Sequence, residues 1–169
     1  YRVVTLIEDD LALIKAGPDV RRQFLDQALL LQDQEYAPEV RKFRKVLEHR
    51  NKLLQQRSCT DESFALWTKQ LWEHVQSLQK RRMDLMKQLE KKINKILKET
   101  FEEQIKVTLS YRAKNAEPGE SYENFEIRYT EKKLFSEERR YGRSLFGAHL
   151  DDLVISFQDK KTKQYASRG

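Results

Sequence analysis

Apolar residues recur at helical spacing through most of the first hundred positions of the chain. Pro18 marks the first turn of a helix with Val20, Phe24, Leu25, Leu29 and Leu30 at helical intervals. A second helix opens at Pro38, and its apolar seam is Val40, Phe43, Leu47 and Leu54. The longest helix is predicted from about residue 61 to residue 103, without Gly or Pro. Its stripe is close to a heptad repeat: Leu71, Val75, Leu78, Leu85, Leu89, Ile93 and Ile96. The two seams predict an antiparallel, coiled-coil-like helical hairpin.

Alternation of apolar and polar residues replaces this pattern after residue 103. Residues 105–111 and 125–129 each alternate, with a turn signal at 117–120 between them, and together predict an antiparallel strand pair. Thr130 is placed to cap a short helix over 131–141. Further strands are expected at 2–7, 153–157 and 163–166, and a short helix at 11–14.

The predicted fold class is therefore α+β, mainly α, with a helical hairpin arm joined to a small antiparallel β region. We divide the chain into four units. Residues 1–17 are a strand and connector, and 18–104 a helical lobe with the long hairpin. Residues 105–141 are the β-pair and short helix, and 142–169 are return strands.

Composition narrows the class of protein. The 169 residues include only 5 Gly and 3 Pro, which excludes collagen-like and low-complexity chains. No apolar run approaches the roughly 20 residues that span a bilayer, so no membrane interaction is expected. Cys59 is the single cysteine, which excludes an intrachain disulfide and indicates an intracellular setting.

Positive charge is concentrated in the helical region. The chain has 33 Lys+Arg and 27 Asp+Glu, a net charge of +6, and the whole excess falls between residues 39 and 103. A basic stripe on the long helix lies opposite Leu89, Ile93 and Ile96, and its members are Lys87, Lys91, Lys95 and Lys98. Such lysines either contact successive phosphates of a nucleic acid or form an ordinary solvated helix face.

Few other residues point to chemistry. His49, His74 and His149 are far apart, and Cys59 has no Cys or His at ligand spacing, so no structural zinc site is expected. The sequence contains neither GxxxxGK[ST] nor GxGxxG. The acidic pair Asp151-Asp152 lies between a Gly-containing turn and a strand, where it forms either a small metal site or an ordinary surface pair. Arg50 falls on the apolar seam and needs a hydrogen-bonded partner if it is buried.

Five segments, in order, resemble the RecF family of bacterial DNA replication and repair proteins, which have an ABC/SMC-type ATPase head. They are residues 10–26, which include Arg21-Arg22 and Phe24-Leu25-Asp26, then residues 50–54, Trp67 with Gln70-Leu71, residues 142–153 and residues 165–169. The chain departs from the family pattern at Thr68, Ala148, Leu150 and Ala166, where the family has Asp, Pro, Arg and Gly.

The resemblance implies a helical second lobe with strands that join it to the ATPase lobe. In the family, Walker A lies upstream of this segment and Walker B downstream, so we expect the chain to be part of a longer protein. The whole protein would be a weak DNA-dependent ATPase that binds ATP and Mg and forms an ATP-dependent homodimer. It would bind single- and double-stranded DNA in the cytoplasm and act with RecR and RecO to load RecA at single-strand gaps, including in the SOS response. No catalytic residue, bound cofactor or ATPase activity is expected in this segment alone.

The same resemblance implies roles for particular residues. Ser167 and Gly169 match the ABC signature, which would face the nucleotide of a partner head. Arg21 and Arg22 match the family's arginine pair, which either contacts DNA or forms ion pairs, including an i,i+4 pair from Arg22 to Asp26. A coiled-coil-like protein-interaction module that binds neither DNA nor nucleotide is the alternative function.

Overall fold

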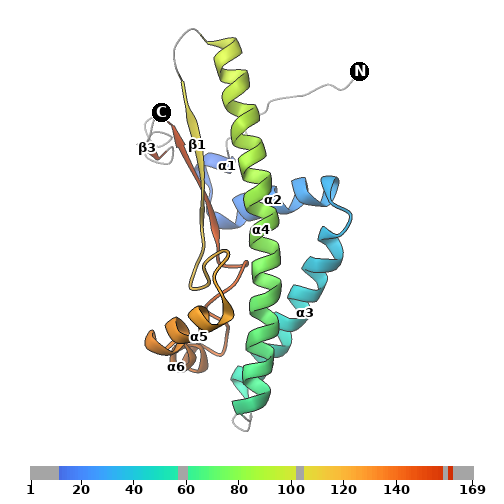
Figure 1. Ribbon diagram of the computed structural model, residues 1–169, viewed down its shortest axis with the longest axis vertical. Coiled ribbons are helices and arrows are strands. Elements are labelled where there is room, and N and C mark those ends of the chain that lie inside the picture. Colours follow the sequence, from blue (N-terminus) through green and yellow to red (C-terminus); the bar gives the residue numbers. More distant parts are fainter. Residues whose placement is uncertain (1–11, 57–60, 102–104, 158–159, 162–169) are drawn as a thin grey trace.

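The computed structural model describes residues 12–56, 61–101, 105–157 and 160–161 (Figure 1). In chain order, the elements are α1 (Ala12–Lys15), α2 (Pro18–Gln32), α3 (Tyr36–Gln55), α4 (Asp61–Thr100), β1 (Val107–Arg112), α5 (Tyr122–Glu131), α6 (Leu134–Tyr141), β2 (Asp152–Phe157) and β3 (Lys160–Lys161). The predicted mainly helical α+β class is confirmed. The predicted strands at 2–7 and 163–166 and the loop that carries Cys59 lie outside the described residues. Among those described, no helix is long and apolar enough to cross a bilayer.

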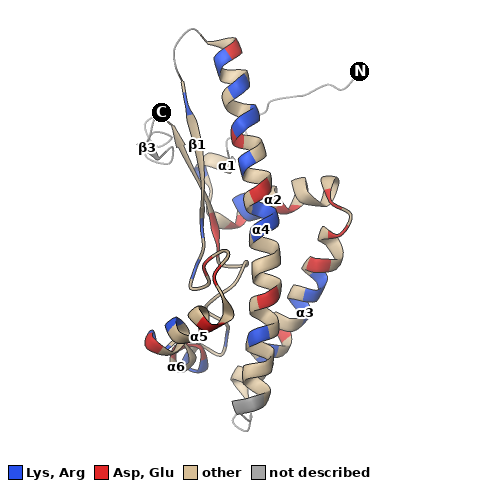
Figure 2. Cartoon of the chain, in the orientation of Figure 1, with Lys and Arg blue, Asp and Glu red and all other residues tan. Residues whose placement is uncertain are grey.

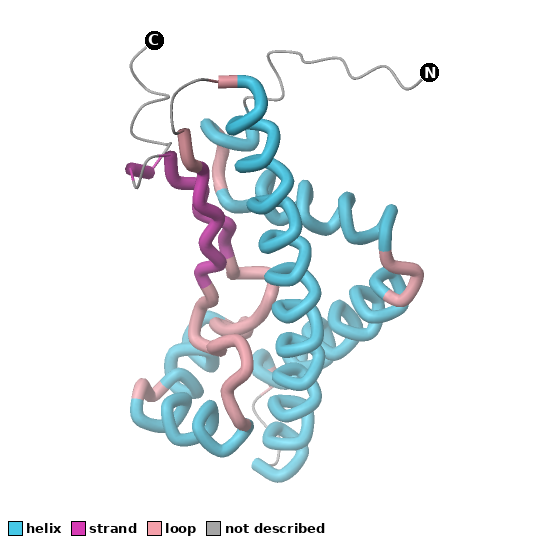
Figure 3. The backbone as a smooth tube through the Cα atoms, turned by 45° about the horizontal axis from the view of Figure 1, so that its top comes forward, coloured by secondary structure: helices cyan, strands magenta, loops and turns pink. Residues whose placement is uncertain are grey.

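The helical hairpin is confirmed, but it uses only the first half of α4. Helix α4 has 40 residues and α3 has 20, so α4 is about 60 Å long and α3 about 30 Å. Helix α3 packs against the first half of α4, whereas the second half lies beside β1 (Figures 1 and 3). The first part of the predicted seam is the core of this hairpin, since Leu71, Val75 and Leu78 are at most 1% exposed, whereas Ile96 near the end of the seam is 60% exposed.

The predicted strand pair between 105–111 and 125–129 is wrong. Strand β1 pairs antiparallel with β2, in a register that runs from Val107 opposite Phe157 to Arg112 opposite Asp152. Residues 125–129 belong to α5, which Ser121 caps by accepting a hydrogen bond from the backbone N–H of Asn124. Phe125 is buried and Ile127 is 58% exposed, so the apparent alternation does not describe one face of a strand.

The predicted helix over 131–141 is shorter than expected. Thr130 lies within α5, and α6 begins at Leu134 after Lys133, which has a left-handed backbone with φ of 50°. The turn predicted at 117–120 is present, with Gly119 at φ of 78° after Pro118. Gln76 of α4 fixes this turn, because its amide donates to Glu117 O and accepts from Gly119 N.

Two polar side chains of α4 cover the outer edge of β1. The Asn94 amide donates to Val107 O at 2.7 Å and accepts from Val107 N at 2.8 Å. One turn earlier, the Glu90 carboxylate accepts from Leu109 N at 2.7 Å. An unpaired strand edge invites pairing with other chains, and these contacts satisfy part of it. They also fix the sheet against the second half of α4.

Candidate nucleic-acid interface and the buried networks behind it

The predicted basic stripe of Lys87, Lys91, Lys95 and Lys98 is exposed on the second half of α4. Figure 2 marks the basic residues along this part of the helix. The side chains of Lys87 and Lys95 are 78% and 76% exposed. Three acids lie on the same half of the helix, and exposed Asp84 pairs with Lys87 at 4.0 Å. Glu90 is directed to the backbone of β1, and the Glu99 carboxylate lies 3.8 Å from Lys95 Nζ. The four lysines lie within 12 residues, about 16 Å along the helix axis.

Arg21 and Arg22 lie at the junction between α2 and the start of β2. The Arg21 guanidinium is 8% exposed and forms a bidentate pair with Asp152 at 2.8 and 2.9 Å, and it also donates to Ala16 O. Arg22 donates to Asp151 O and pairs with Asp19. The i,i+4 pair predicted between Arg22 and Asp26 is wrong, because Asp26 pairs with Arg82 instead.

The carboxylates of Asp151 and Asp152 accept hydrogen bonds from other groups of the protein. Asp151 is fully buried and accepts hydrogen bonds from Gln79 Nε2, Tyr111 OH and Lys114 N, each at 2.8 Å. Burial raises the pKa of Asp151, although these three donors act in the opposite direction. Within the described part of the chain, no three His, Cys, Asp or Glu residues are grouped so that they could hold a metal ion.

Arg50 is fully buried and has the partner that its place on the seam required. Its guanidinium donates to both oxygens of Glu138, at 3.2 and 2.6 Å, and Glu138 is also fully buried. The remaining donors are directed to Ser144 Oγ, Thr68 Oγ1 and Tyr129 OH. This network, which we call the Arg50 network, joins α3, α4, α5 and α6 to the loop before β2.

The Arg50 network places an aromatic hydroxyl against a carboxylate. Tyr129 donates to Glu138 Oε2, and burial is the main cause that raises the pKa of Tyr129 above its ordinary value. Thr68, one of the departures from the RecF pattern, accepts from Arg50 Nε and donates to Phe64 O. Sequence reasoning identified Arg50 but not Glu138, which lies 88 positions away.

A second buried arginine, Arg82, ties α4 to α2 and to the loop before β2. It pairs with Asp26 at 2.8 Å and donates to Ala148 O at 2.6 Å. The hydroxyl of Tyr36 donates to the same Asp26 carboxylate. Burial is the main cause that raises the pKa of Tyr36. The sequence does not single out Arg82, because Lys80-Arg81-Arg82 form a run of charged residues on a long helix.

His149 lies in the same loop, where its ring is 5.9 Å from that of Phe43. Its Nδ1 is buried without a hydrogen-bond partner among the described residues. Burial lowers the pKa of His149 to about 4, and the nearby Arg22 adds to this effect. The ring is therefore neutral near pH 7.

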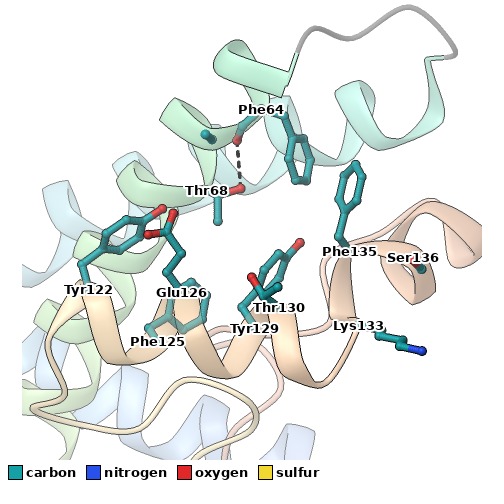
Figure 4. A pocket seen from close by; sticks show the side chains of 11 residues that line it. Phe64, Thr68, Tyr122, Phe125, Glu126, Tyr129, Thr130, Lys133, Phe135 and Ser136 are labelled. Atoms are coloured by element: carbon teal, nitrogen blue, oxygen red, sulfur yellow. Dashed lines mark hydrogen bonds between the residues drawn. The ribbon is translucent and has the colours of Figure 1, made fainter.

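An open pocket of about 460 Å³ lies between the first turns of α4 and the α5–α6 pair (Figure 4). We call it the aromatic pocket. Its lining residues are Phe64, Ala65, Thr68, Tyr122, Phe125, Glu126, Tyr129, Thr130, Lys133, Phe135 and Ser136. The pattern of the sequence does not predict this pocket, because the alternation over residues 125–129 favours a strand.

Other residues singled out in the sequence are placed as follows. Ser167, Gly169 and Cys59 lie outside the described residues. Trp67 stacks on His49 with ring centroids 4.0 Å apart, and Trp72 meets Tyr122 edge-on at 5.4 Å. Both tryptophans are partly buried and packed against the core.

Comparison with known proteins identifies relatives of the whole chain. No protein-family model matches the sequence. The DNA replication and repair protein RecF of Halalkalibacterium halodurans is 30% identical over 175 residues, which covers 99% of this chain and 47% of that protein. RecF of Exiguobacterium sp. is 31% identical over 177 residues, covering all of this chain and 47% of that protein. The chain thus spans about half the length of these curated relatives.

Solved structures agree with the sequence comparison at the level of the fold. The recombination mediator protein RecF-ATP in the RecFOR pathway superposes with a TM-score of 0.82 at 23% identity, over 97% of this chain and 45% of that one. A second structure of the same mediator, RecF-ATPrS, gives a TM-score of 0.81. The expected resemblance to RecF and the fold that it implied are both confirmed.

Proposed function

We propose that this chain, which is related to RecF proteins along nearly its whole length, is the arm-bearing part of a RecF-like DNA repair and recombination mediator. Its role would be to present the second half of α4 to the phosphate backbone of DNA. The exposed basic stripe of Lys87, Lys91, Lys95 and Lys98 is the observation that supports this proposal. Ammonium groups at steps of three or four residues contact phosphates without reading sequence, as a protein that acts at gaps of any sequence requires.

The half of α4 that carries the stripe is held in place by hydrogen bonds and an ion pair to neighbouring elements. The second half of α4 is fixed to β1 by Asn94 and Glu90, and to α2 by Arg82 and Asp26. Arg21 and Arg22 are engaged with Asp152 and Asp151 in the junction between α2 and β2. We therefore assign a DNA contact to the lysines first, and to the exposed part of Arg22 only as an addition.

The finer functions follow the resemblance to RecF. The whole protein would bind ATP with Mg, dimerise with ATP, and work in the cytoplasm with RecR and RecO to load RecA. Ser167 and Gly169 would face the γ-phosphate held by a partner head, where a hydroxyl and backbone N–H groups form an anion site. In this scheme the lysine stripe contributes affinity for DNA, and the ATPase chemistry belongs to other parts of the protein.

The test is DNA affinity after removal of the stripe. In the variant Lys87→Gln/Lys91→Gln/Lys95→Gln/Lys98→Gln, affinity for a labelled gapped duplex should fall at least about tenfold at 100 mM salt, because four phosphate contacts are lost. The matched control removes four exposed cations from α3: Arg41, Lys42, Arg44 and Lys45. Equal affinity of the stripe variant and the unmodified chain, or a larger loss in the α3 control, would reject the stripe as the DNA surface.

A further inference from the structure

The aromatic pocket exists because large rings hold two helices apart and small residues lie between the rings. At one end Trp72 of α4 meets Tyr122 of α5, and at the other Phe64 of α4 meets Phe135 of α6 at 4.8 Å. Between these contacts α4 presents only Ala65 and Thr68 (Figure 4). The space that small side chains leave between the helices is open to solvent and falls in the size range of ligand pockets.

One carboxylate lines this aromatic space. Glu126 is exposed on α5, and no hydrogen bond or ion pair within the described residues engages it. Figure 4 shows its carboxylate beside the ring of Tyr122, whose pKa is raised by burial and by Glu126. Lys133 also lines the pocket, but its ammonium group points away from the other labelled side chains (Figure 4).

Acidic side chains predominate on α5 itself, whereas the exposed Lys132 and Lys133 follow this helix and Lys69 of α4 lies near the Tyr122 ring. Glu123, Glu126 and Glu131 are exposed on α5. Arg128, the basic residue of that helix, is already paired with Glu117 and Glu120. Glu126 remains a carboxylate without an ion-pair partner among the described residues, and such a group attracts a cationic side chain.

The rings of the pocket are also of the kind that bind cations. Lys69 Nζ lies 5.7 Å from the ring centroid of Tyr122, and the Arg139 guanidinium carbon lies 5.6 Å from that of Phe135. Behind the pocket wall, the Arg50 guanidinium lies 4.6 Å from the ring centroid of Phe64. Each of these distances is within the range of a cation–π contact.

We propose that the aromatic pocket binds an arginine side chain from a basic segment of a protein partner. A guanidinium stacks on aromatic faces and offers a planar fork to a carboxylate, and here Glu126 is that carboxylate. The proposal concerns α5 and its groove with α4, so it stands independently of whether the lysine stripe binds DNA.

The experiment is a titration of the isotopically labelled 169-residue chain with short peptides, followed by backbone amide shifts. The probes are acetyl-Gly-Arg-Gly-amide and two counterparts with citrulline or leucine in place of arginine. The citrulline peptide lacks the charge but keeps the shape of the side chain, whereas the leucine peptide lacks both. The variant Glu126→Gln removes the carboxylate. The matched control Glu123→Gln removes the same charge from the same helix at a position that does not line the pocket.

The arginine peptide should shift the amides of Tyr122, Glu126 and Tyr129, and Glu126→Gln should weaken its binding about tenfold, through loss of a charge-assisted contact. Glu123→Gln and the unmodified chain should bind the arginine peptide with nearly the same affinity. The citrulline and leucine peptides should bind the unmodified chain more weakly than the arginine peptide does. An additional variant, Ala65→Trp, should abolish the shifts by filling the space while leaving Glu126 in place. The proposal fails if the leucine peptide binds as tightly as the arginine peptide, if Glu126→Gln binds like the unmodified chain, or if a single-stranded oligonucleotide binds these residues more tightly.

Discussion

The buried pair of Arg50 and Glu138 gives a sharp prediction about stability. Both side chains are fully buried, and the carboxylate also accepts hydrogen bonds from Tyr129 and from Leu145 N. The substitution Glu138→Gln keeps the size of the side chain but leaves the Arg50 charge without its counter-ion. Breaking a buried pair in this way costs about 3–5 kcal/mol of the free energy of unfolding.

Thermal unfolding monitored by circular dichroism measures this cost. For a domain of this length each kcal/mol lowers the midpoint by about 2–4 °C, so Glu138→Gln should lower it by roughly 6–20 °C. The double variant Arg50→Met/Glu138→Gln should lose less than the sum of the single losses, because it leaves no unpaired charge.

The control for this pair lies on the same helix. Lys52 and Glu48 form an exposed i,i+4 pair at 2.8 Å, and Glu48→Gln should leave the midpoint almost unchanged. If Glu138→Gln and Glu48→Gln lower the midpoint equally, the reasoning from burial is refuted.

Three further predictions concern the core, acid stability and nucleotides. Leu78 is 1% exposed, so Leu78→Ala should cost about 2–5 kcal/mol in urea unfolding, and a loss no larger than that of Leu66→Ala, at a residue 56% exposed, would contradict the hairpin core. His149 has a folded pKa of about 4, below its unfolded value, so the unfolded state binds the proton first and the free energy of unfolding should fall by up to about 3 kcal/mol between pH 6.5 and pH 4. Denaturant titrations should show this slope, and an equal slope in His149→Phe would assign it to other groups. Calorimetry with ATP should give no binding to this chain, because the sequence contains no GxxxxGK[ST] motif, and stoichiometric heat of binding would overturn that expectation.

The helical arm could be predicted from the sequence because its signals are local. The two prolines and the apolar stripe of α4 are signals read within a few residues of the chain, so the approximate positions of the helices follow from them. The prediction that Arg50 needs a hydrogen-bonded partner is also local, because it follows from the place of Arg50 on the apolar seam of α3. The exposure of the four stripe lysines follows from the same periodicity.

The β region and the polar partners depend on contacts between residues far apart in the chain. Strand β1 pairs with β2, which begins 40 positions after β1 ends, and the turn at 117–120 suggested a nearer partner. Tyr122, Phe125 and Tyr129 also fit a helix, and Ser121 is the cap that would have indicated it. Glu138 and Asp152 could not be assigned to Arg50 and Arg21, since many acids in the chain fit the same role equally well.

The salt dependence of DNA binding tests the central claim most directly. For duplex DNA, the slope of log affinity against log salt is about −0.9 for each phosphate neutralised, so loss of four lysine contacts should make the slope less negative by about 3.6. The stripe variant should therefore lose far less affinity than the unmodified chain between 50 and 200 mM salt, with the two differing by roughly 100-fold in that loss. If the unmodified chain binds DNA and the stripe variant has the same slope, the lysines of α4 do not contact the phosphates and the account is wrong.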